Sequence, residues 1–158
     1  MEKIYIEFLS ELETHLDEIE NSCWHSWMKK SIDKYNENQD VSYFLSAFGG
    51  CGSYNDEYKK SETTQILTNI VYSMAIQIQK QGYFDLTTIL QNEQIFQKKS
   101  LDSFKEYANS FQNERYIDEC IKRLNYINYI VDNYSVGNLN KITSEYFKQK
   151  INDDVKRK

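Results

Sequence analysis

The sequence predicts an all-α fold: a single-domain, compact bundle of about seven or eight helices with a glycine-rich loop after the third. Three observations predict it. Apolar residues recur at intervals of three and four along most of the chain, which places them on one face of successive helices. Proline, which commonly separates strands and long loops, is absent from all 158 residues. Three of the five glycines fall within positions 49–52, so one loop has a special backbone requirement.

Three helices are predicted before the glycine cluster. Residues 2–20 form the first, with an apolar stripe of Ile4, Tyr5, Phe8, Leu9, Leu12, Leu16 and Ile19. Ser22 can cap the second, which ends at the polar segment 36–39 and gathers on one face Trp24, Trp27, Met28, Ile32 and Tyr35. Asp40 can cap a short third helix, which Gly49 is expected to end in the left-handed conformation.

A long helix is predicted after the glycine cluster. Either Ser61 or Thr63 can cap its start, and Gly82 stands where a C-terminal cap is expected. Its wide apolar face indicates a central position and consists of Ile66, Leu67, Ile70, Val71, Met74, Ala75 and Ile78. Residues 83–97 have some strand character, but their polar flanks and helical neighbours favour a short helix.

The C-terminal part is predicted to be helical as well. Ser100 can cap a helix that carries Leu101, Phe104, Ala108 and Phe111. A longer helix spans residues 117–134 and stops before Gly137. The last helix covers about residues 139–151, and the lysine-ended tail 153–158 is expected to fray.

Composition predicts one folded domain, residues 1–158, in the cytoplasm. The 13 Tyr, 8 Phe and 2 Trp residues make the chain too aromatic for a disordered protein. No apolar run approaches the ~20 residues that span a bilayer, and residues 1–4 lack the layout of a signal peptide. Because Cys23, Cys51 and Cys120 form no Cys-x-x-Cys pair, we expect reduced thiols.

The glycine-rich loop does not match the chemistry of an active site. A phosphate-binding loop continues with Gly-Lys-Ser/Thr, whereas Gly52 is followed by Ser-Tyr-Asn-Asp-Glu. A nucleophilic Cys51 needs a base, and no sequence signature places either His15 or His25 beside it. The loop is therefore predicted to be structural, through Gly49, Gly50, Gly52 and a hydrogen-bonding Asn55.

Binding of metals and of nucleic acids is not predicted. His15, Cys23 and His25 lie close in the sequence, but their spacing matches no established zinc pattern. Nucleic-acid binding depends on basic residues that neutralise phosphates, and this chain has a net charge of −5 with its lysines scattered outside the tail. We expect no cofactor.

The acidic residues are concentrated in the first predicted helix. Residues 1–20 contain one base and seven acids: Glu2, Glu7, Glu11, Glu13, Asp17, Glu18 and Glu20. Like charges four positions apart, and acids at the C-terminal end, do little for helix stability. Two explanations stay open. The carboxylates are solvated or neutralised by lysines of another helix, or they form an acidic surface that steers a basic partner into place.

A fingerprint in residues 22–80 carries a family resemblance. It consists of Trp24-x-x-Trp27-Met28, the run Ser46-Ala-Phe-Gly-Gly-Cys-Gly-Ser-Tyr-Asn-Asp56 and the helical Ile70-Val-Tyr-Ser-Met-Ala75. These motifs resemble a family of small uncharacterised bacterial proteins, some of which resemble immunity proteins encoded beside polymorphic or contact-dependent toxins. The chain departs from that family's pattern at Cys51, Tyr54 and Glu57, where the family has methionine, phenylalanine and an apolar residue.

The resemblance implies an immunity protein that binds and neutralises a cognate bacterial toxin, and no catalytic residue. The acidity favours a basic, nuclease-type toxin domain, because a protein that grips phosphates is complementary to carboxylates. The predicted toxin-binding residues are Glu11, Glu13, Asp17, Glu18, Glu20, Asp56 and Glu57. Two alternatives stay open: a small-ligand-binding protein or enzyme that uses Cys51, and a helical scaffold subunit that oligomerises through exposed tyrosines.

Overall fold

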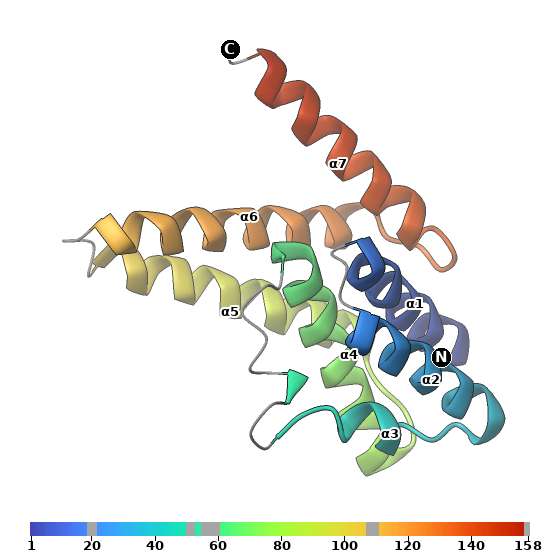
Figure 1. Cartoon of the computed structure of the whole chain (residues 1–158). Coiled ribbons are helices and arrows are strands. Elements are labelled where there is room, and N and C mark those ends of the chain that lie inside the picture. Colours follow the sequence, from blue (N-terminus) through green and yellow to red (C-terminus); the bar gives the residue numbers. More distant parts are fainter. Residues whose placement is uncertain (19–21, 50–52, 55–60, 107–110, 157–158) are drawn as a thin grey trace.

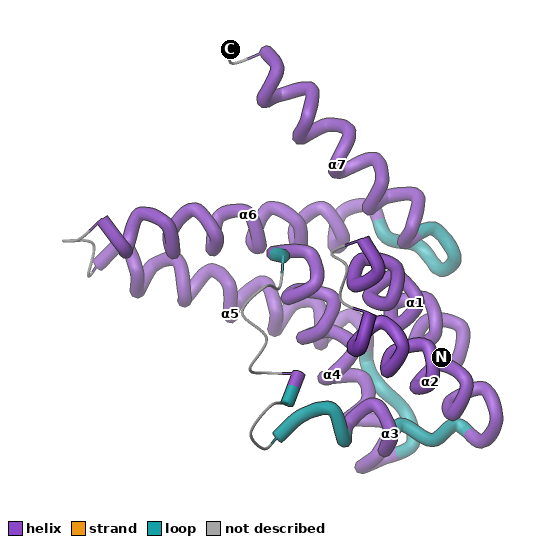
Figure 2. The backbone as a smooth tube through the Cα atoms, in the orientation of Figure 1, coloured by secondary structure: helices purple, strands orange, loops and turns teal. Residues whose placement is uncertain are grey.

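The computed structural model describes residues 1–18, 22–49, 53–54, 61–106 and 111–156, without the side chains of 17, 18, 22, 111–113 and 153–156. Over these residues it contains seven helices and no strand (Figures 1 and 2). Their bounds are α1 Glu2–Glu18, α2 Ser22–Asn38, α3 Ser42–Leu45, α4 Glu62–Gln81, α5 Leu86–Glu106, α6 Phe111–Asn133 and α7 Leu139–Lys156. The predicted all-α class and number of helices are confirmed.

One hydrophobic core receives side chains from all seven helices. α4 lies at its centre and contacts α1, α3, α5 and α6, while α1 also packs against α2 and α7. From α1 the core takes the predicted stripe, in which Tyr5, Phe8, Leu9, Leu12 and Leu16 are fully buried. Burial of these apolar side chains is the main force that holds the helices together.

The ends of α4 are the predicted ones. The Ser61 hydroxyl accepts a hydrogen bond from the Thr64 N–H at 3.1 Å, which satisfies one of the free donors of the first turn. At the other end Gly82 is left-handed, with φ of 77°, and its N–H donates to the Ile78 carbonyl. Both caps could be predicted from the sequence, because each acts within a few residues of the helix end.

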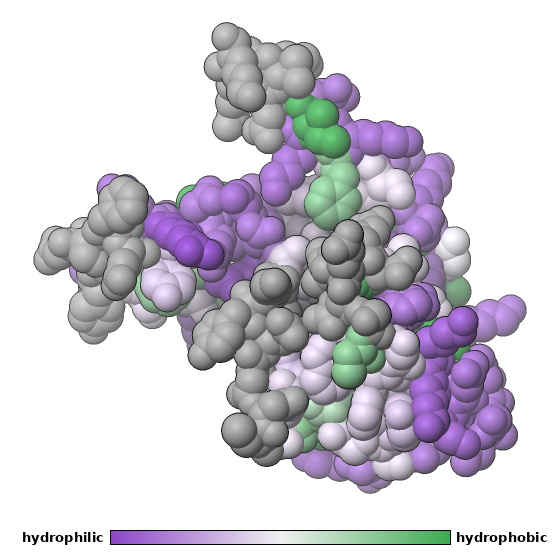
Figure 3. Space-filling view, viewed as in Figure 1, coloured by the Kyte–Doolittle hydropathy of each residue, from purple (hydrophilic) through white to green (hydrophobic). Residues whose placement is uncertain are grey.

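α5 and α6 form an antiparallel pair that extends away from the core (Figure 1). The Phe104 and Tyr116 rings stack near the far end of this pair, with centroids 5.4 Å apart. Closer to the core, the Gln94 amide donates to Asn128 at 2.9 Å. α7 contacts α6 and α1 and then diverges from α6 along its length (Figure 1). Ile151 on α7 is 63% exposed. Figure 3 shows hydrophobic residues on the part of the surface that α7 forms.

Three predicted boundaries were wrong. The short helix over 83–97 and the helix capped by Ser100 are one continuous α5, in which the Ser100 hydroxyl donates to the Phe96 carbonyl. The helix starts at Leu86, directly after Asp85, whose carboxylate accepts hydrogen bonds from the N–H and hydroxyl of Thr88. These hydrogen bonds lower the pKa of Asp85. Phe111, predicted in the same helix as Ser100, instead begins α6.

Two shorter differences concern α3 and α7. The third helix covers only Ser42–Leu45 and is followed by turns, although Asp40 does accept hydrogen bonds from the N–H and hydroxyl of Ser42 at 2.8 Å. α7 continues to Lys156, beyond the predicted end near Ile151. The predicted fraying of residues 153–158 stays a prediction.

Candidate functional site

Three of the described carboxylates of α1, those of Glu7, Glu11 and Glu13, are turned toward the protein itself. Glu7 is half-buried, and one of its carboxylate oxygens accepts hydrogen bonds from the Tyr134 hydroxyl at 2.8 Å and the Gly137 N–H at 3.0 Å. Its other oxygen accepts from the Leu139 N–H at 2.8 Å. Burial, and then this hydrogen bond to the Glu7 carboxylate, raise the pKa of Tyr134. Glu7 therefore fixes the turn between α6 and α7.

Glu11 and Glu13 have partners on other elements. Glu11 is only 5% exposed, accepts a hydrogen bond from the Asn140 amide at 3.2 Å, and lies 3.3 Å from His15 Nε2. Glu13 lies 2.6 Å from Nε2 of His25, which connects α1 to α2. The Glu11 contacts are buried, whereas the contact between Glu13 and His25 is partly exposed.

These contacts correct the predicted binding surface. Glu11 cannot be a contact residue of a docked protein, because its carboxylate is buried under α7. Glu13 keeps part of its surface exposed but already faces a histidine. Among the described residues, the partners found for these two carboxylates are the Asn140 amide, His15 and His25. The other predicted contacts lie outside the described side chains: Asp17, Glu18, Glu20, Asp56 and Glu57.

The glycine-rich segment is described only at its two ends. Gly49 has φ of 99°, so its predicted positive φ is confirmed. Its predicted role as the helix cap was wrong, because α3 ends at Leu45 and Ser46 is its C-cap. Tyr54 is fully buried: its N–H donates to the Ala47 carbonyl at 2.9 Å, and its hydroxyl lies 2.9 Å from that of Thr68 on α4. The loop exit is therefore held on the core, as a structural loop requires. Gly50, Cys51, Gly52 and Asn55 lie outside the described residues.

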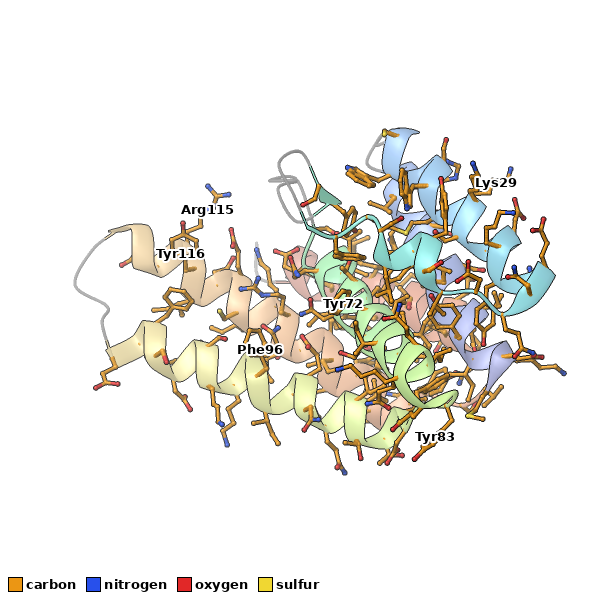
Figure 4. All side chains as sticks on the ribbon, turned by 90° about the horizontal axis from the view of Figure 1, so that it is seen from below. Lys29, Tyr72, Tyr83, Phe96, Arg115 and Tyr116 are labelled. Carbon is orange, nitrogen blue, oxygen red and sulfur yellow. The ribbon has the colours of Figure 1, made fainter. Side chains whose placement is uncertain are left out.

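A continuous set of aromatic rings surrounds Tyr54. Neighbouring ring centroids lie 4.7 Å apart for Trp27–Tyr43, 5.8 Å for Trp24–Trp27, 5.2 Å for Trp24–Tyr54, 5.5 Å for Phe48–Tyr54 and 4.7 Å for Phe48–Tyr72. The Trp27 indole N–H donates to the Tyr43 carbonyl, which holds α2 against α3. Tyr72 projects from the outer side of α4 (Figure 4).

The rings around Tyr54 that keep solvent-exposed surface form what we call the aromatic surface: Trp24, Trp27, Tyr43, Phe48 and Tyr72. Tryptophan and tyrosine supply large, rigid contact area and are enriched among the residues that dominate protein–protein binding energy. Lys30 flanks it, with Nζ 5.1 Å from the Tyr43 ring centroid. Both tryptophans pack against the core with one part of the ring and keep another part exposed, and helical periodicity does not reveal how much of a ring stays exposed.

The histidines and cysteines do not assemble into a reactive centre over the described residues. His15 and His25 each face a glutamate, as given above. Cys23 is exposed and Cys120 is fully buried. No group of three or more His, Cys, Asp or Glu side chains in the described part of the chain could hold a metal ion.

Comparisons of the chain with protein-family models, curated proteins and solved structures find no match. Among the helices described above, none has an apolar stretch long enough to cross a bilayer. Among the described residues, the arrangement that stands out is a surface: the rings around the glycine-rich loop, within the segment that carries the family resemblance.

Proposed function

We propose that this protein is an immunity protein that binds a cognate bacterial toxin domain in the cytoplasm and blocks its active site or the entry of its substrate. The observation that supports the proposal most is a coincidence of position. The residues that resemble the immunity-like family, 22–80, are also those that build the aromatic surface. A fingerprint needed only for folding would not require so many half-exposed rings at one place.

The aromatic surface supplies the contact area for the toxin in this proposal. Trp24, Trp27 and Tyr43 are fixed by ring contacts and by the indole hydrogen bond, so little side-chain freedom is lost when a partner docks. Tyr72 is 38% exposed at the outer end of the ring set. Rigid aromatic side chains of this kind contribute strongly to affinity because their ordering is complete before binding.

The net charge supports a basic toxin domain, such as a nuclease. The chain carries −5 at neutral pH, and long-range attraction depends on the total charge even where single carboxylates have internal partners. This attraction speeds association more than it tightens the final complex. The aromatic surface supplies contact area in this proposal, and the contact role of Asp17, Glu18 and Glu20, whose side chains are not described, stays a prediction.

Co-expression tests the proposal. The toxin-like product of the adjacent gene is expressed with this protein, and we expect the two to co-purify and the protein to rescue growth of cells that make the toxin. Tyr72→Ala is expected to weaken the complex about tenfold, which corresponds to ~1.4 kcal/mol at an interface anchor. Tyr116→Ala is the matched control, because Tyr116 is 47% exposed but lies near the start of α6, at the outer end of the α5–α6 pair (Figure 4).

The outcomes separate the proposal from its alternatives. Absence of both a complex and growth rescue contradicts the immunity function. A complex that Tyr116→Ala weakens as much as Tyr72→Ala does supports the function but places the interface elsewhere. Native mass measurement of the isolated protein tests the scaffold alternative, which requires a defined oligomer.

A further inference from the structure

A largely buried cluster of polar side chains lies where the α5–α6 pair meets α4 (Figure 1). At its centre is Glu93 of α5, whose Oε1 accepts hydrogen bonds from the Asn69 amide on α4 at 2.9 Å and the Gln97 amide on α5 at 2.7 Å. From α6 comes Arg123, whose charge acts on Glu93 and whose Nη2 donates to the Cys120 sulfur at 3.3 Å. We call this cluster the polar junction: Asn69, Glu93, Gln97, Cys120 and Arg123.

Two polar atoms of the polar junction have no hydrogen-bond partner among the described residues. They are the side-chain carbonyl oxygen of Gln97, a residue that is only 1% exposed, and Nε of Arg123. A buried polar atom without a partner costs folding free energy, so nearly all such atoms in proteins are paired. In this arrangement one acceptor and one donor of the same cluster stay unused.

The carboxylate of Glu93 also has an unused oxygen. Both amides donate to Oε1, and the described side chains supply no hydrogen bond to Oε2. Within the same part of the structure, no ion pair joins Glu93 to Arg123, although the charge of Arg123 acts on the carboxylate. The second oxygen is therefore the position where Glu93 can hold a proton or receive a further donor.

The unused atoms fit two different charge states of Glu93. When Oε2 is protonated, it can donate to the carbonyl oxygen of Gln97, one helical turn away, while the Gln97 amide still donates to Oε1. When Glu93 is ionised, Oε2 can accept from Nε of Arg123, because a guanidinium forms its strongest hydrogen bonds with a carboxylate. Each state thus satisfies an atom that the other leaves unpaired.

The surroundings of Glu93 favour neither charge state alone. Burial raises the pKa of Glu93, whereas the hydrogen bonds from Asn69 and Gln97 and the charge of Arg123 lower it. Among the described elements, α5 packs against α4 and α6. α4 presents the neutral Asn69 amide, and α6 presents the Arg123 cation with the Cys120 thiol beside it. One proton therefore decides whether Arg123 has a negative charge to pair with.

We propose that the polar junction is a proton-dependent switch, which ties α6 to α5 when Glu93 is ionised and releases it when Glu93 is protonated. In the ionised state Arg123 turns from the Cys120 sulfur to the Glu93 carboxylate, and this ion pair joins the two helices. In the protonated state Glu93 pairs with Gln97 within α5, and Arg123 returns to Cys120. The proton is exchanged with solvent. The switch depends on the fold and not on the proposed function.

A pH titration of the whole protein followed by NMR tests the switch. The Glu93 carboxyl carbon, the Gln97 side-chain amide and the Arg123 Nε–H are observed from about pH 4 to about pH 8. We expect the three signals to change with one common midpoint, because one proton controls them. Protection of the Arg123 Nε–H against hydrogen exchange, relative to free arginine at the same pH, should rise about tenfold once Glu93 is ionised.

Variants assign the titration to Glu93. Glu93→Gln carries an amide that can pair with Gln97 as the protonated acid does, so Gln97 and Arg123 should keep their low-pH signals at every pH. Glu106→Gln changes an exposed carboxylate at the end of the same helix and should leave both titrations unchanged.

Three results would overturn the switch: a Gln97 or Arg123 signal that does not follow the Glu93 midpoint, a signal that still titrates in Glu93→Gln, or constant protection of the Arg123 Nε–H. If Glu93→Gln fails to fold, the titration of the natural protein decides by the first and third of these results.

Discussion

The carboxylate of Glu7 accepts a hydrogen bond from the backbone N–H of Leu139, which lies 132 positions later in the chain, at 2.8 Å. Leu139 begins α7, and the first N–H groups of a helix have no partner within that helix. A carboxylate at this place satisfies the donor and interacts favourably with the helix dipole. Because the same group also accepts from Tyr134 and Gly137, one side chain of α1 holds the end of α6, the turn and the start of α7 together.

Removal of the Glu7 charge should therefore loosen α7. Glu7→Gln is expected to lower the free energy of unfolding by about 1–3 kcal/mol, because an amide replaces a charged acceptor and brings its own donors into a site that offers only donors. Urea denaturation followed by circular dichroism measures the change.

Glu145→Gln is the matched control for Glu7→Gln. Glu145 is on α7, but its carboxylate makes only an exposed contact with Lys141, at 3.9 Å. The change should be near zero, as for most exposed ion pairs. Equal losses for the two variants would mean that Glu7 does not fix α7.

Glu93 gives the protein a distinct pH dependence. It lies between α4 and α5 and accepts hydrogen bonds from the Asn69 amide at 2.9 Å and the Gln97 amide at 2.7 Å. Burial raises its pKa, although these hydrogen bonds and the charge of Arg123 oppose the change. Since the folded state binds the proton more tightly than the unfolded state, this group favours folding at low pH. The contribution is lost as the pH rises through the folded-state pKa.

The direction of this pH dependence can be checked with Glu93→Gln, whose side chain at position 93 is uncharged at every pH. Relative to the natural protein, the variant should gain free energy of unfolding as the pH rises from about 4, and the difference should level off above the raised pKa. Chemical denaturation at a series of pH values measures it. A difference that stays constant with pH would show that burial does not control the ionisation of Glu93.

The amino-acid sequence defines local features of this fold much better than distant ones. Ser61, Gly82 and the buried stripe of α1 were predictable because helix caps and periodicity act within one or two turns. The partner of Glu7 was not, because nothing in the sequence relates it to a turn near residue 137. The same reason explains the error over Glu11: a row of carboxylates on a helix looks exposed until the helix that covers it is known.

A helix start was predicted at Ser100, whereas the observed helix starts after Asp85, and this error has a similar physical origin. Ser100 has the residue type of a cap, but within α5 its hydroxyl can donate to the carbonyl four residues back, at Phe96. Asp85 is the stronger cap, since its charged carboxylate accepts two hydrogen bonds from Thr88. Both residues are compatible with the start of a helix. The packing of α5 against α6 decides whether the segment after Gly82 forms one helix or two.

Gly82 should be sensitive to substitution for a backbone reason alone. A β-carbon at this position would meet nothing within 4 Å, so Gly82→Ala causes no clash. The residue must nevertheless remain at φ of 77°, and an L-residue in this conformation costs about 1–2 kcal/mol. We expect this loss in the free energy of unfolding, and a smaller one for Gly82→Asn, because asparagine tolerates the left-handed region. Equal losses for alanine and asparagine would point to another cause.

The reactivity of the cysteine thiols distinguishes a binding protein, whose thiols are unreactive, from an enzyme that uses Cys51. Cys120 is fully buried, with its sulfur 3.3 Å from Nη2 of Arg123, whereas Cys23 is exposed. Iodoacetamide should therefore label Cys23 in the folded protein. Cys120 should react only when the fold opens, at a rate at least about a thousandfold lower. Peptide mass spectrometry after timed labelling gives each rate. Under the proposed function Cys51 has no catalytic task, and we expect it to react no faster than Cys23. A Cys51 that reacts much faster than Cys23 would favour the enzyme, since only a thiol with a lowered pKa gains that advantage.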